Sequence, residues 1–280
     1  MMLTKEMLVE ALRGFEIEKD SILLVHSSLK ALGPIDGGAE TVIAALEETV
    51  SEGTLVFPTF AQKNWETVME DWHMDRPSDV GYITEVFRKQ EGSLRSDNPT
   101  HSVAARGKHA EALVGGDIKA GPRIGPYGEY PFSHGSPWQR MYDSREKFGV
   151  KCYVMFWGVT TSPMTFKHFV EYLLIEDLLN QVKNEAKREE FKARLSVYPA
   201  SAPFTWPMYS TRAFGPKFQE AGIAKILPVG EGEIICGDAK LLVDFTDKTL
   251  RENIFTLTRD EPFHQWYREI CDYIASEENQ

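Results

Sequence analysis

Short apolar runs of strand type, separated by polar loops and helical segments, constrain the fold of this chain more than any other feature. Residues 22–25 (ILLV) form one such run, and residues 54–60 (TLVFPTF) form the next. Between the two, apolar residues recur at helical spacing from Val42 to Val50. An order of strand, loop, helix and strand is typical of α/β proteins. We therefore expect an α/β fold with a layered central sheet flanked by helices.

The remaining periodic segments extend this plan along the chain. Apolar residues at helical spacing from Leu8 to Phe15, behind a possible Thr4 cap, predict an N-terminal helix. By the same criteria we expect strands at 150–157, 223–229 and 233–236, the last two as a hairpin. We expect one helix to start near Ser102 or Val103 and another to run from Ser162-Pro163 to about Asn180. Further helices are expected over the charged residues 183–194, at 241–250 and from Phe263 to Ile274. Residues 197–218 alternate aromatics with prolines and give no clear prediction.

Two long segments without clear periodicity interrupt these elements, at residues 61–79 and 115–137. The second is rich in glycine, proline and aromatic residues. A loop of this length in a compact domain usually has a functional reason. The alternative, a linker between two domains, would be more polar and less aromatic. We therefore expect residues 1–280 to form a single domain with long ordered loops.

The charge balance excludes several kinds of partner. The chain of 280 residues carries 31 Lys and Arg against 42 Asp and Glu, a net charge of −11, and has no run of five basic residues. An acidic surface repels phosphate backbones and anionic lipids, so we expect neither nucleic acid nor membrane as a partner. The same charge attracts cationic small molecules, although acidity equally serves solubility.

Cysteine content and the N-terminal sequence favour a cytoplasmic protein. Cys152, Cys236 and Cys271 are odd in number and far apart, which argues against a disulfide framework and against a paired zinc motif. The first 15 residues lack an apolar core of signal-peptide length, and no stretch approaches the ~20 apolar residues of a membrane span. Common hydrolase, kinase and dehydrogenase motifs (G-x-S-x-G, Walker A, a strand-linked G-x-G-x-x-G, H-E-x-x-H) are missing from the sequence.

Two segments near expected strands combine hydroxyl groups with turns. Residues 25–38 (VHSSLKALGPIDGG) lie between a strand and a helix whose exposed amides would suit a phosphate, unless Ser27 and Ser28 only cap a turn. Residues 95–107 (RSDNPTHSVAARG) place His101 among hydroxyls, where it is a base, a metal ligand or a capping residue. The residues alone leave these alternatives open.

A third segment, residues 158–174 (GVTTSPMTFKHFVEYLL), carries a histidine and a carboxylate. Apolar residues between Phe166 and Leu174 form a helical stripe that must face the core. Thr165, His168 and Glu171 recur every three residues on the opposite face, close enough for imidazole and carboxylate to interact. A carboxylate beside a histidine fixes its tautomer and raises its basicity, as a general base requires. The alternative is a solvated polar face with an incidental His and Glu.

Taken in order, these segments resemble the aminoglycoside 3-N-acetyltransferase family, a group of acetyl-CoA-dependent enzymes. The resemblance runs through residues 25–38, 95–107, 131–141 (PFSHGSPWQRM) and 156–174, from about Leu24 to Leu174. Residues 222–244 resemble the C-terminal region of the family more loosely. Four motifs in the same order with comparable spacing are more specific than any one of them.

The resemblance implies the fold of this family, acetyl-CoA as co-substrate and no metal. It implies His168 as the catalytic histidine and Glu171 as its carboxylate partner. The residues expected to bind the cofactor are His26, Ser27, Ser28 and Leu29 in the first segment, Ser96, Thr100, Ser102 and Val103 in the second, and Ser136 in the Gly-Ser-Pro loop.

Elementary chemistry agrees with this assignment, because an ammonium group must lose a proton before its nitrogen can attack a thioester. We expect direct transfer in a ternary complex, with backbone amides or the Thr165 hydroxyl as oxyanion donors. A route through an acetyl-cysteine has less support, since only Cys152 has a basic neighbour, Lys151, and neighbours in a strand point to opposite faces.

The acceptor is open between an aminoglycoside amine and an amino sugar of surface-polysaccharide biosynthesis. Two other functions are alternatives: a non-catalytic CoA- or sugar-binding module, and a metal-dependent hydrolase with His101, His168 and Glu171 as ligands. Monomer and dimer are both compatible with the sequence.

Overall fold

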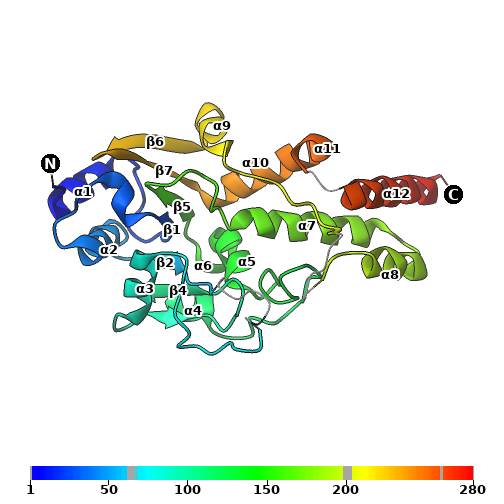
Figure 1. Cartoon of the computed structure of the whole chain (residues 1–280), viewed down its shortest axis with the longest axis horizontal. Helices are drawn as coiled ribbons and strands as arrows, with labels where there is room; N and C mark the ends of the chain where they lie inside the picture. Colours follow the sequence, from blue (N-terminus) through cyan, green and yellow to red (C-terminus); the bar gives the residue numbers. More distant parts are fainter. Residues whose placement is uncertain (1, 62–66, 68, 198–203, 259–260, 280) are drawn as a thin grey trace.

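A seven-stranded mixed sheet organises the molecule (Figure 1). The computed structural model describes residues 2–61, 67, 69–197, 204–258 and 261–279. The strand order is β3-β4-β2-β1-β5-β7-β6. The strands are β1 (Ile22–Ser27), β2 (Thr54–Pro58), β3 (Leu94–Arg95), β4 (Val103–Gly107), β5 (Cys152–Trp157), β6 (Ala224–Val229) and β7 (Gly232–Asp238). The expected α/β fold with a central sheet is thereby confirmed.

The centre of the sheet is parallel and its flanks are antiparallel. β1 pairs in parallel with β2 through Leu24 and Val56, and with β5 through Ser27 and Trp157. On one side β4 runs antiparallel to β2, and β3 antiparallel to β4. On the other side β7 and β6 form the expected hairpin. The carboxyl ends of β1, β2 and β5 therefore meet at one edge, together with the start of β4.

Helices cover both faces of the sheet. The helical elements are α1 (Lys5–Arg13), η1 (Leu29–Leu32), α2 (Gly38–Thr49), α3 (Tyr82–Lys89), α4 (Ala110–Val114), α5 (Pro137–Tyr142), α6 (Ser144–Phe148), α7 (Phe166–Gln181), α8 (Glu185–Ala193), α9 (Phe214–Glu220), α10 (Ala239–Glu252), α11 (Ile254–Leu257) and α12 (Glu261–Glu278). One apolar core joins the sheet to α1, α2 and α3, and a larger one joins the opposite face to α4, α5, α7 and α10. None of the described helices is long and apolar enough to cross a lipid bilayer.

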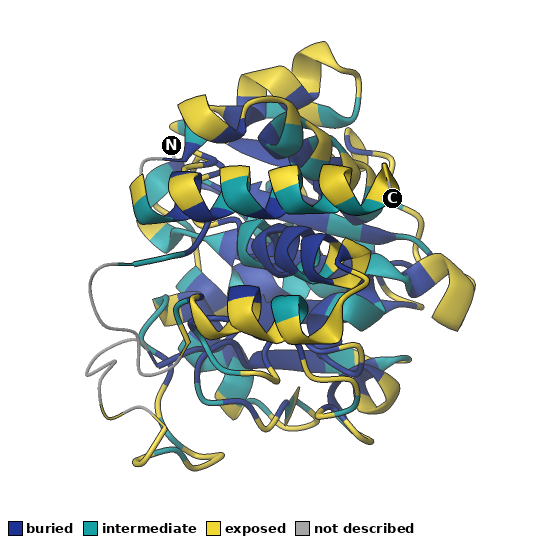
Figure 2. Ribbon diagram, turned by 90° about the vertical axis from the view of Figure 1, so that its right-hand side faces the viewer, coloured by how far each residue is buried: buried dark blue, intermediate teal, exposed yellow. Residues whose placement is uncertain are grey.

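Helix α7 lies inside the second layer, with α5, α8, α10 and α12 packed around it. In Figure 2 the helices nearest the viewer expose their outer sides, whereas the helix between them is buried. Glu171 and Tyr172 are buried along with the apolar stripe. A solvated polar face on this helix was the wrong alternative, because neighbouring segments cover that side as well.

Most expected elements are present, and two need correction. Thr4 caps α1, and the helices expected over 183–194, 241–250 and 263–274 are present as α8, α10 and α12. The helix expected from Ser102 or Val103 is wrong: this segment is strand β4, because its pairing with β2 outweighs the helical preference of its alanines. The helix expected from Ser162-Pro163 begins later, at Phe166, after a turn in which the Met164 amide donates to the Thr161 carbonyl.

Residues 115–136 are an ordered loop between α4 and α5, as expected. The segment expected as a long excursion, 61–79, lies partly outside the described residues, as does the unassigned stretch 197–218. Within that stretch, residues 204–213 run without regular structure to α9. The described residues of these two segments approach α7 or the adjacent edge of the sheet.

Candidate active site

The edge of the sheet where the parallel strands end is hollowed into a cleft of about 660 Å³. Its walls come from the ends of β1 (His26, Ser27) and β2 (Pro58, Phe60), from the start of α3, from His101 before β4, and from residues between Val159 and His168. Open α/β sheets bind ligands at this edge, and the volume suits a small-molecule site. The three motif segments of the sequence thus converge on one cleft.

His168 and Glu171 form an imidazole–carboxylate pair at this cleft. His168 Nδ1 lies 2.9 Å from Glu171 Oε2, and the exposed fractions of the two side chains are 15% and 0%. Because an ionised carboxylate only accepts hydrogen bonds, the contact places a proton on Nδ1 and leaves a lone pair on Nε2. The imidazole therefore lines the cleft, and the carboxylate lies behind it in the protein interior.

A second donor reaches the same carboxylate from a segment that the sequence left unassigned. The Nε1–H of Trp206 donates to Glu171 Oε2 over 2.9 Å, and the indole is fully buried. Glu171 Oε1, also buried, has no hydrogen-bond partner among the described residues. No sequence pattern links Trp206 to a residue 35 positions earlier, so only the fold identifies this contact.

The cleft contains two further histidines, and both are buried. Burial lowers the pKa of His26 to about 3, so this imidazole is neutral at physiological pH. Burial, with smaller contributions from the positive charges of His168 and Lys167, holds the pKa of His101 well below its ordinary value. Among the described residues, neither ring contacts a carboxylate in the way that His168 does. His168 is therefore the cleft histidine best suited to accept a proton.

Of the first motif, residues 25–38, the initial residues lie at the cleft. His26 and Ser27 line it, and the His26 ring stacks on Phe156 at 5.5 Å. Ser28 and Leu29 follow directly at the half-buried start of η1. Gly158 makes this close approach possible, since it has a φ of 63° and a Cβ there would lie 2.6 Å from Ala31 Cβ. The end of β5 is thereby packed against η1.

Thr165 also lines the cleft, one residue before α7 begins. Its side chain is nearly buried, and its hydroxyl lies 3.5 Å from the Pro163 carbonyl, a long contact for a hydrogen bond. A hydroxyl held this loosely can turn toward a ligand. Thr165 and His168 are three residues apart, so both face the same space.

The other motif residues are buried, and their polar groups bond within the protein. The Ser96 hydroxyl accepts from the Val103 amide, and the Thr100 hydroxyl donates to the Tyr127 carbonyl. Ser102 donates to the Thr59 carbonyl, and Ser136 caps α5 by accepting from the Gln139 amide. Neither these side chains nor Val103 are among the described residues that line the cleft, whereas His101, which the resemblance did not include in the cofactor set, lines it.

Tyr127 in the long loop was not predicted as a site residue, yet its ring lies edge-on to His168 at 4.6 Å and to His101 at 4.8 Å. The Tyr172 hydroxyl fixes this loop by accepting from the Tyr127 amide and donating to the Gly128 carbonyl. A Cβ at Gly125 would lie 2.1 Å from the Tyr172 ring, so this close contact requires glycine. The long loop thus contacts two of the histidines that line the cleft.

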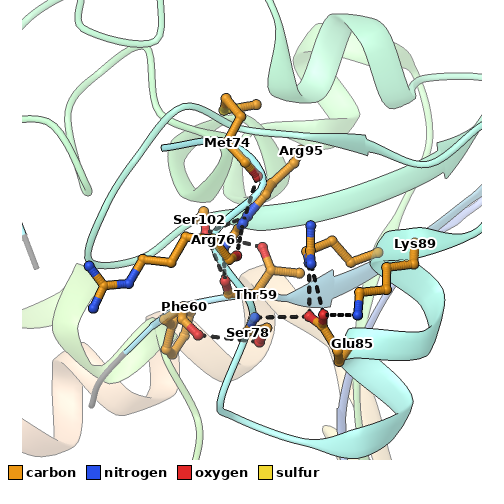
Figure 3. A network of polar contacts seen from close by, with 10 residues as sticks. Thr59, Phe60, Met74, Arg76, Ser78, Glu85, Lys89, Arg95 and Ser102 are labelled. Carbon is orange, nitrogen blue, oxygen red and sulfur yellow. Dashed lines mark hydrogen bonds and ion pairs between the residues drawn. The ribbon is translucent and has the colours of Figure 1, made fainter. Parts of the chain in front are cut away.

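A network around Arg95 supports the wall of the cleft that includes Phe60 and Asp79 (Figure 3). The guanidinium donates to the carbonyls of Thr59, Met74 and Arg76, and to the Ser102 hydroxyl. Burial and the positive charge of Arg88 lower the pKa of Arg95 to about 10, so the group remains a cation at neutral pH.

Ser78 extends the same network toward α3. Its hydroxyl donates to the Phe60 carbonyl, and its amide donates to Glu85 (Figure 3). Glu85 also accepts from Arg88. These contacts fix the residues just before Asp79, Val80 and Gly81, which line the cleft.

Cysteine and metal chemistry receive no support from the site geometry. Cys152 is buried at the amino end of β5, whereas the cleft lies at the carboxyl end of that strand. Burial holds the pKa of its thiol well above the ordinary value, and Lys151 pairs with Glu18. Within the described part of the chain, no three His, Cys, Asp or Glu side chains are grouped to hold a metal ion, so His101, His168 and Glu171 do not form such a set.

Comparison with known proteins identifies the family. A sequence profile described as aminoglycoside 3-N-acetyltransferase matches residues 24–251, which is most of the chain. The chain belongs to the aminoglycoside 3-N-acetyltransferase family. The family resemblance drawn from the motifs is therefore confirmed, and it extends past Leu174 through the C-terminal hairpin and α10.

Individual relatives of this aminoglycoside 3-N-acetyltransferase family member match over shorter spans. The chain is 29% identical over 195 residues to the SPbeta prophage-derived aminoglycoside N(3')-acetyltransferase-like protein YokD of Bacillus subtilis, covering 60% of this chain and 65% of the relative. It is 31% identical over 129 residues to an aminoglycoside N(3)-acetyltransferase III of Salmonella, covering 40% and 45%. The matches thus span less than two thirds of these relatives.

Solved structures confirm the family fold over nearly the whole chain. The apoenzyme of aminoglycoside acetyltransferase AAC(3)-IVa superimposes with a TM-score of 0.68 at 18% identity, covering 95% of this chain and 98% of that one. AAC-IIIb, solved as a binary complex with CoASH, gives a TM-score of 0.67 at 19% identity, covering 90% and 97%. At these identities the likeness concerns the fold.

Proposed function

We propose that this protein transfers the acetyl group of acetyl-CoA to a primary amine of an aminoglycoside-type acceptor. The observation that carries the proposal is the His168–Glu171 pair, 2.9 Å apart at a cleft of suitable size, in a chain of this family. Acetyl-CoA is the co-substrate of the family, and AAC-IIIb was solved with CoASH on the same fold.

The proposed reaction is a direct aminolysis of the thioester. His168 Nε2 accepts the proton that the acceptor nitrogen loses, so that a neutral amine attacks the acetyl carbonyl. An N–C bond forms and the C–S bond breaks, with the bonding pair leaving on sulfur. The nitrogen gives up its second proton to that sulfur, so CoA leaves as the thiol. Glu171 stabilises the imidazolium that forms beside it. A positioned general base of this kind accelerates reactions by roughly 10²–10⁴-fold.

Thr165 is the proposed oxyanion donor. Its loosely held hydroxyl lines the cleft on the same side as His168. A donor aimed at the developing negative charge on the carbonyl oxygen stabilises the transition state more than the ground state. Backbone amides are the alternative oxyanion donors.

For the co-substrate, we propose direct contacts with His26, Ser27, Ser28 and Leu29 at the end of β1. The proposal is supported by the place of His26 and Ser27 in the cleft wall and by the half-buried start of η1 beside them. For Ser96, Thr100, Ser102, Val103 and Ser136 we propose an indirect contribution. Their internal hydrogen bonds and burial suit residues that fix the shape of the cofactor groove.

For the acceptor, we propose a cationic amine. Asp79 lines the cleft, and the chain carries a net charge of −11. A histidine-to-alanine mutant of AAC(3)-IVa has been solved in complex with a gentamicin and with apramycin. Electrostatic attraction raises the local concentration of such polycations near an acidic protein.

We further propose that residues 1–280 act as one catalytic domain in the cytoplasm. One continuous sheet supports the first part, because its strands come from Ile22 through Asp238. The three cysteines are free, which suits a reducing compartment.

A thiol-release screen tests the proposed function. Acetyl-CoA is mixed with the protein and with gentamicin, apramycin, or free or nucleotide-linked amino sugars, and released CoA thiol is measured against a sample without acceptor. We expect thiol release with the aminoglycosides and a mass increase of the acceptor by one acetyl group. Release with amino sugars alone would change the acceptor class. Tight CoA binding with no release for any amine would indicate a binding module instead.

A further inference from the structure

The buried carboxylate of Glu171 receives two hydrogen bonds, and both reach the same oxygen. His168 Nδ1 and Trp206 Nε1 each lie 2.9 Å from Oε2. The other oxygen, Oε1, has no hydrogen-bond partner within the described residues. A buried carboxylate is oriented by the donors around it, since few other forces restrain the final torsion of a glutamate. Trp206 therefore supplies half of the described hydrogen bonding that orients Glu171.

Trp206 is itself held in place from both sides of its segment. Next to it, the Thr205 amide donates to the Ser196 hydroxyl over 2.7 Å. Further along, the Thr211 hydroxyl donates to the Thr161 carbonyl, also over 2.7 Å. The indole packs edge-on against the Tyr172 ring at 5.1 Å.

The Tyr209 hydroxyl adds a link to α7 itself by donating to the Lys167 carbonyl over 3.1 Å. Together these contacts hold the Trp206 N–H group against the carboxylate behind the proposed base.

We propose that Trp206 is a positioning residue that acts on His168 through Glu171. The inference rests on the proposed function for its catalytic consequence, but the contact itself can be tested without turnover. The indole N–H fixes the carboxylate so that Oε2 meets Nδ1, which keeps the lone pair of Nε2 directed into the cleft. It also withdraws part of the negative charge from Oε2, because a hydrogen bond to an anion stabilises it.

The direction in which the titration of His168 moves follows from the negative charge on Glu171 Oε2. With the indole N–H removed, the carboxylate faces the imidazole with its charge less compensated. The imidazolium form is then stabilised, so His168 takes up its proton at a higher pH. The positive end of the indole N–H dipole is lost at the same time, which acts in the same direction.

Other ionisable groups around the pair stay unchanged by this substitution. On the cleft side these are His101, Tyr127, Lys167 and Asp79. Burial, and more weakly the negative charge of Glu171, hold the pKa values of Tyr127 and Tyr209 above their ordinary value, so both phenols are neutral near pH 7.

Tyr172 is neutral for the same reasons, because burial first and then contacts that include Glu171 raise the pKa of its phenol. A change in the titration of His168 on altering Trp206 is therefore attributable to the carboxylate between them.

The test is the titration of His168 by NMR in protein with ¹⁵N-labelled histidine, its signals assigned by their loss in His168→Asn. The variant is Trp206→Phe, which removes the N–H and keeps a buried ring. The matched control is Trp266→Phe, because Trp266 is equally buried but donates to the Phe191 carbonyl between α8 and α12. We expect the midpoint to rise by about one pH unit in Trp206→Phe and to stay unchanged in the control. An unchanged midpoint in a folded Trp206→Phe protein overturns the proposal.

Two further measurements keep the proposal falsifiable. In wild-type protein the Trp206 indole N–H resonance should shift with the same midpoint as His168, whereas the Trp266 resonance should not. This measurement does not depend on the folding of any variant.

In turnover, Trp206→Phe should lower kcat about tenfold with the KM for acetyl-CoA unchanged. If no amine is acetylated by the wild-type protein but the midpoint still shifts, the proposed function fails and the positioning of His168 by Trp206 stands. If the indole resonance ignores the His168 titration, the positioning fails.

Discussion

The two walls of the cleft use charge in opposite ways. On the α7 wall an anion, Glu171, is buried behind an imidazole and touches only two donors among the described residues. The other wall, which includes Phe60 and Asp79, is supported by a cation, Arg95, that contacts backbone carbonyls and a hydroxyl (Figure 3). The Trp72 ring lies 4.6 Å from its guanidinium.

The difference shows what each wall can do. A carboxylate next to a titratable ring controls where a proton is held, so the α7 wall is equipped for proton transfer. A guanidinium bonded to neutral oxygens neither gains nor loses a proton at neutral pH, but its fork of N–H groups orders the segments that carry the accepting oxygens. The comparison predicts that substitutions on the α7 wall change kcat, whereas those on the Arg95 wall change stability and KM.

His168→Asn should produce the largest loss. Asparagine keeps a polar side chain but cannot accept a proton at neutral pH, so kcat should fall by roughly 10²–10⁴-fold while the Kd for CoA is retained. Steady-state thiol release and calorimetric CoA titration measure the two quantities. His134→Asn is the control, since His134 pairs with Glu176 and is half exposed. Equal losses of kcat in His168→Asn and His134→Asn would contradict the claim that the α7 wall is the one equipped for proton transfer.

Glu171→Gln should have the next largest effect. The amide oxygen can still accept from His168 and Trp206, but the negative charge that stabilises the imidazolium is gone. We expect kcat to fall by about 10–100-fold and the acid limb of the pH–rate profile to move to lower pH, because His168 loses its stabilising anion. Glu176→Gln, on the same helix, serves as the control. An acid limb that stays in place in Glu171→Gln would show that the carboxylate does not tune the base.

Arg95→Met tests the wall that includes Phe60 and Asp79. The variant leaves several carbonyls without their donor, which costs about 2–3 kcal/mol in the free energy of unfolding. Because the segment leading to Asp79 loosens, KM should rise more than kcat falls. Urea unfolding and steady-state kinetics check both expectations. Arg13→Met is the comparison, since its exposed pair with Glu10 should contribute no more than about 0.5 kcal/mol. A loss confined to kcat would erase the distinction between the walls.

His26→Phe should change how stability depends on pH. Between the ordinary histidine value of 6.5 and a folded-state pKa of about 3, the unfolded chain binds a proton at His26 and the folded protein does not. The free energy of unfolding therefore falls as pH is lowered through this window, by about 1.4 kcal/mol per pH unit from this group. Phenylalanine preserves the stack on Phe156 and cannot titrate, so urea unfolding between the two pKa values should give a shallower slope. Identical slopes would mean that His26 is protonated in the folded protein.

Cys152→Ala should have the smallest effect. The raised pKa keeps the thiol protonated at neutral pH, and the residue lies at the end of β5 away from the cleft. We expect kcat to change by less than about twofold, with no acetylated protein detected by mass spectrometry after incubation with acetyl-CoA alone. Accumulation of an acetyl-cysteine would replace direct transfer with a two-step route.

Local sequence patterns predicted five of the seven strands, the six longest of the described helices and the pairing of His168 with Glu171, because these depend on neighbours within a few residues. The spacing of three positions on one helix was enough to bring imidazole and carboxylate into contact. The same pattern misjudged the surroundings of Glu171. A polar residue opposite an apolar stripe suggests solvent, yet segments distant in sequence cover it here.

Contacts between distant segments explain what sequence reasoning missed. The alanines of β4 favour a helix, but its pairing with β2 makes this segment a strand. Trp206, Tyr127 and Arg95 reach the site from segments whose paths depend on side-chain contacts rather than on a periodic pattern. Family resemblance located the motifs, but it did not distinguish residues that line the cleft from residues that support it.

The pH dependence of kcat/KM for acetyl transfer, compared between wild type and His168→Asn, tests the central claim most directly. The wild type should show an acid limb, because His168 must be neutral to accept the proton of the amine. In His168→Asn the limb should disappear, leaving a slow rate that rises steadily with hydroxide concentration. The same limb with the same midpoint in both proteins would show that another group accepts the proton.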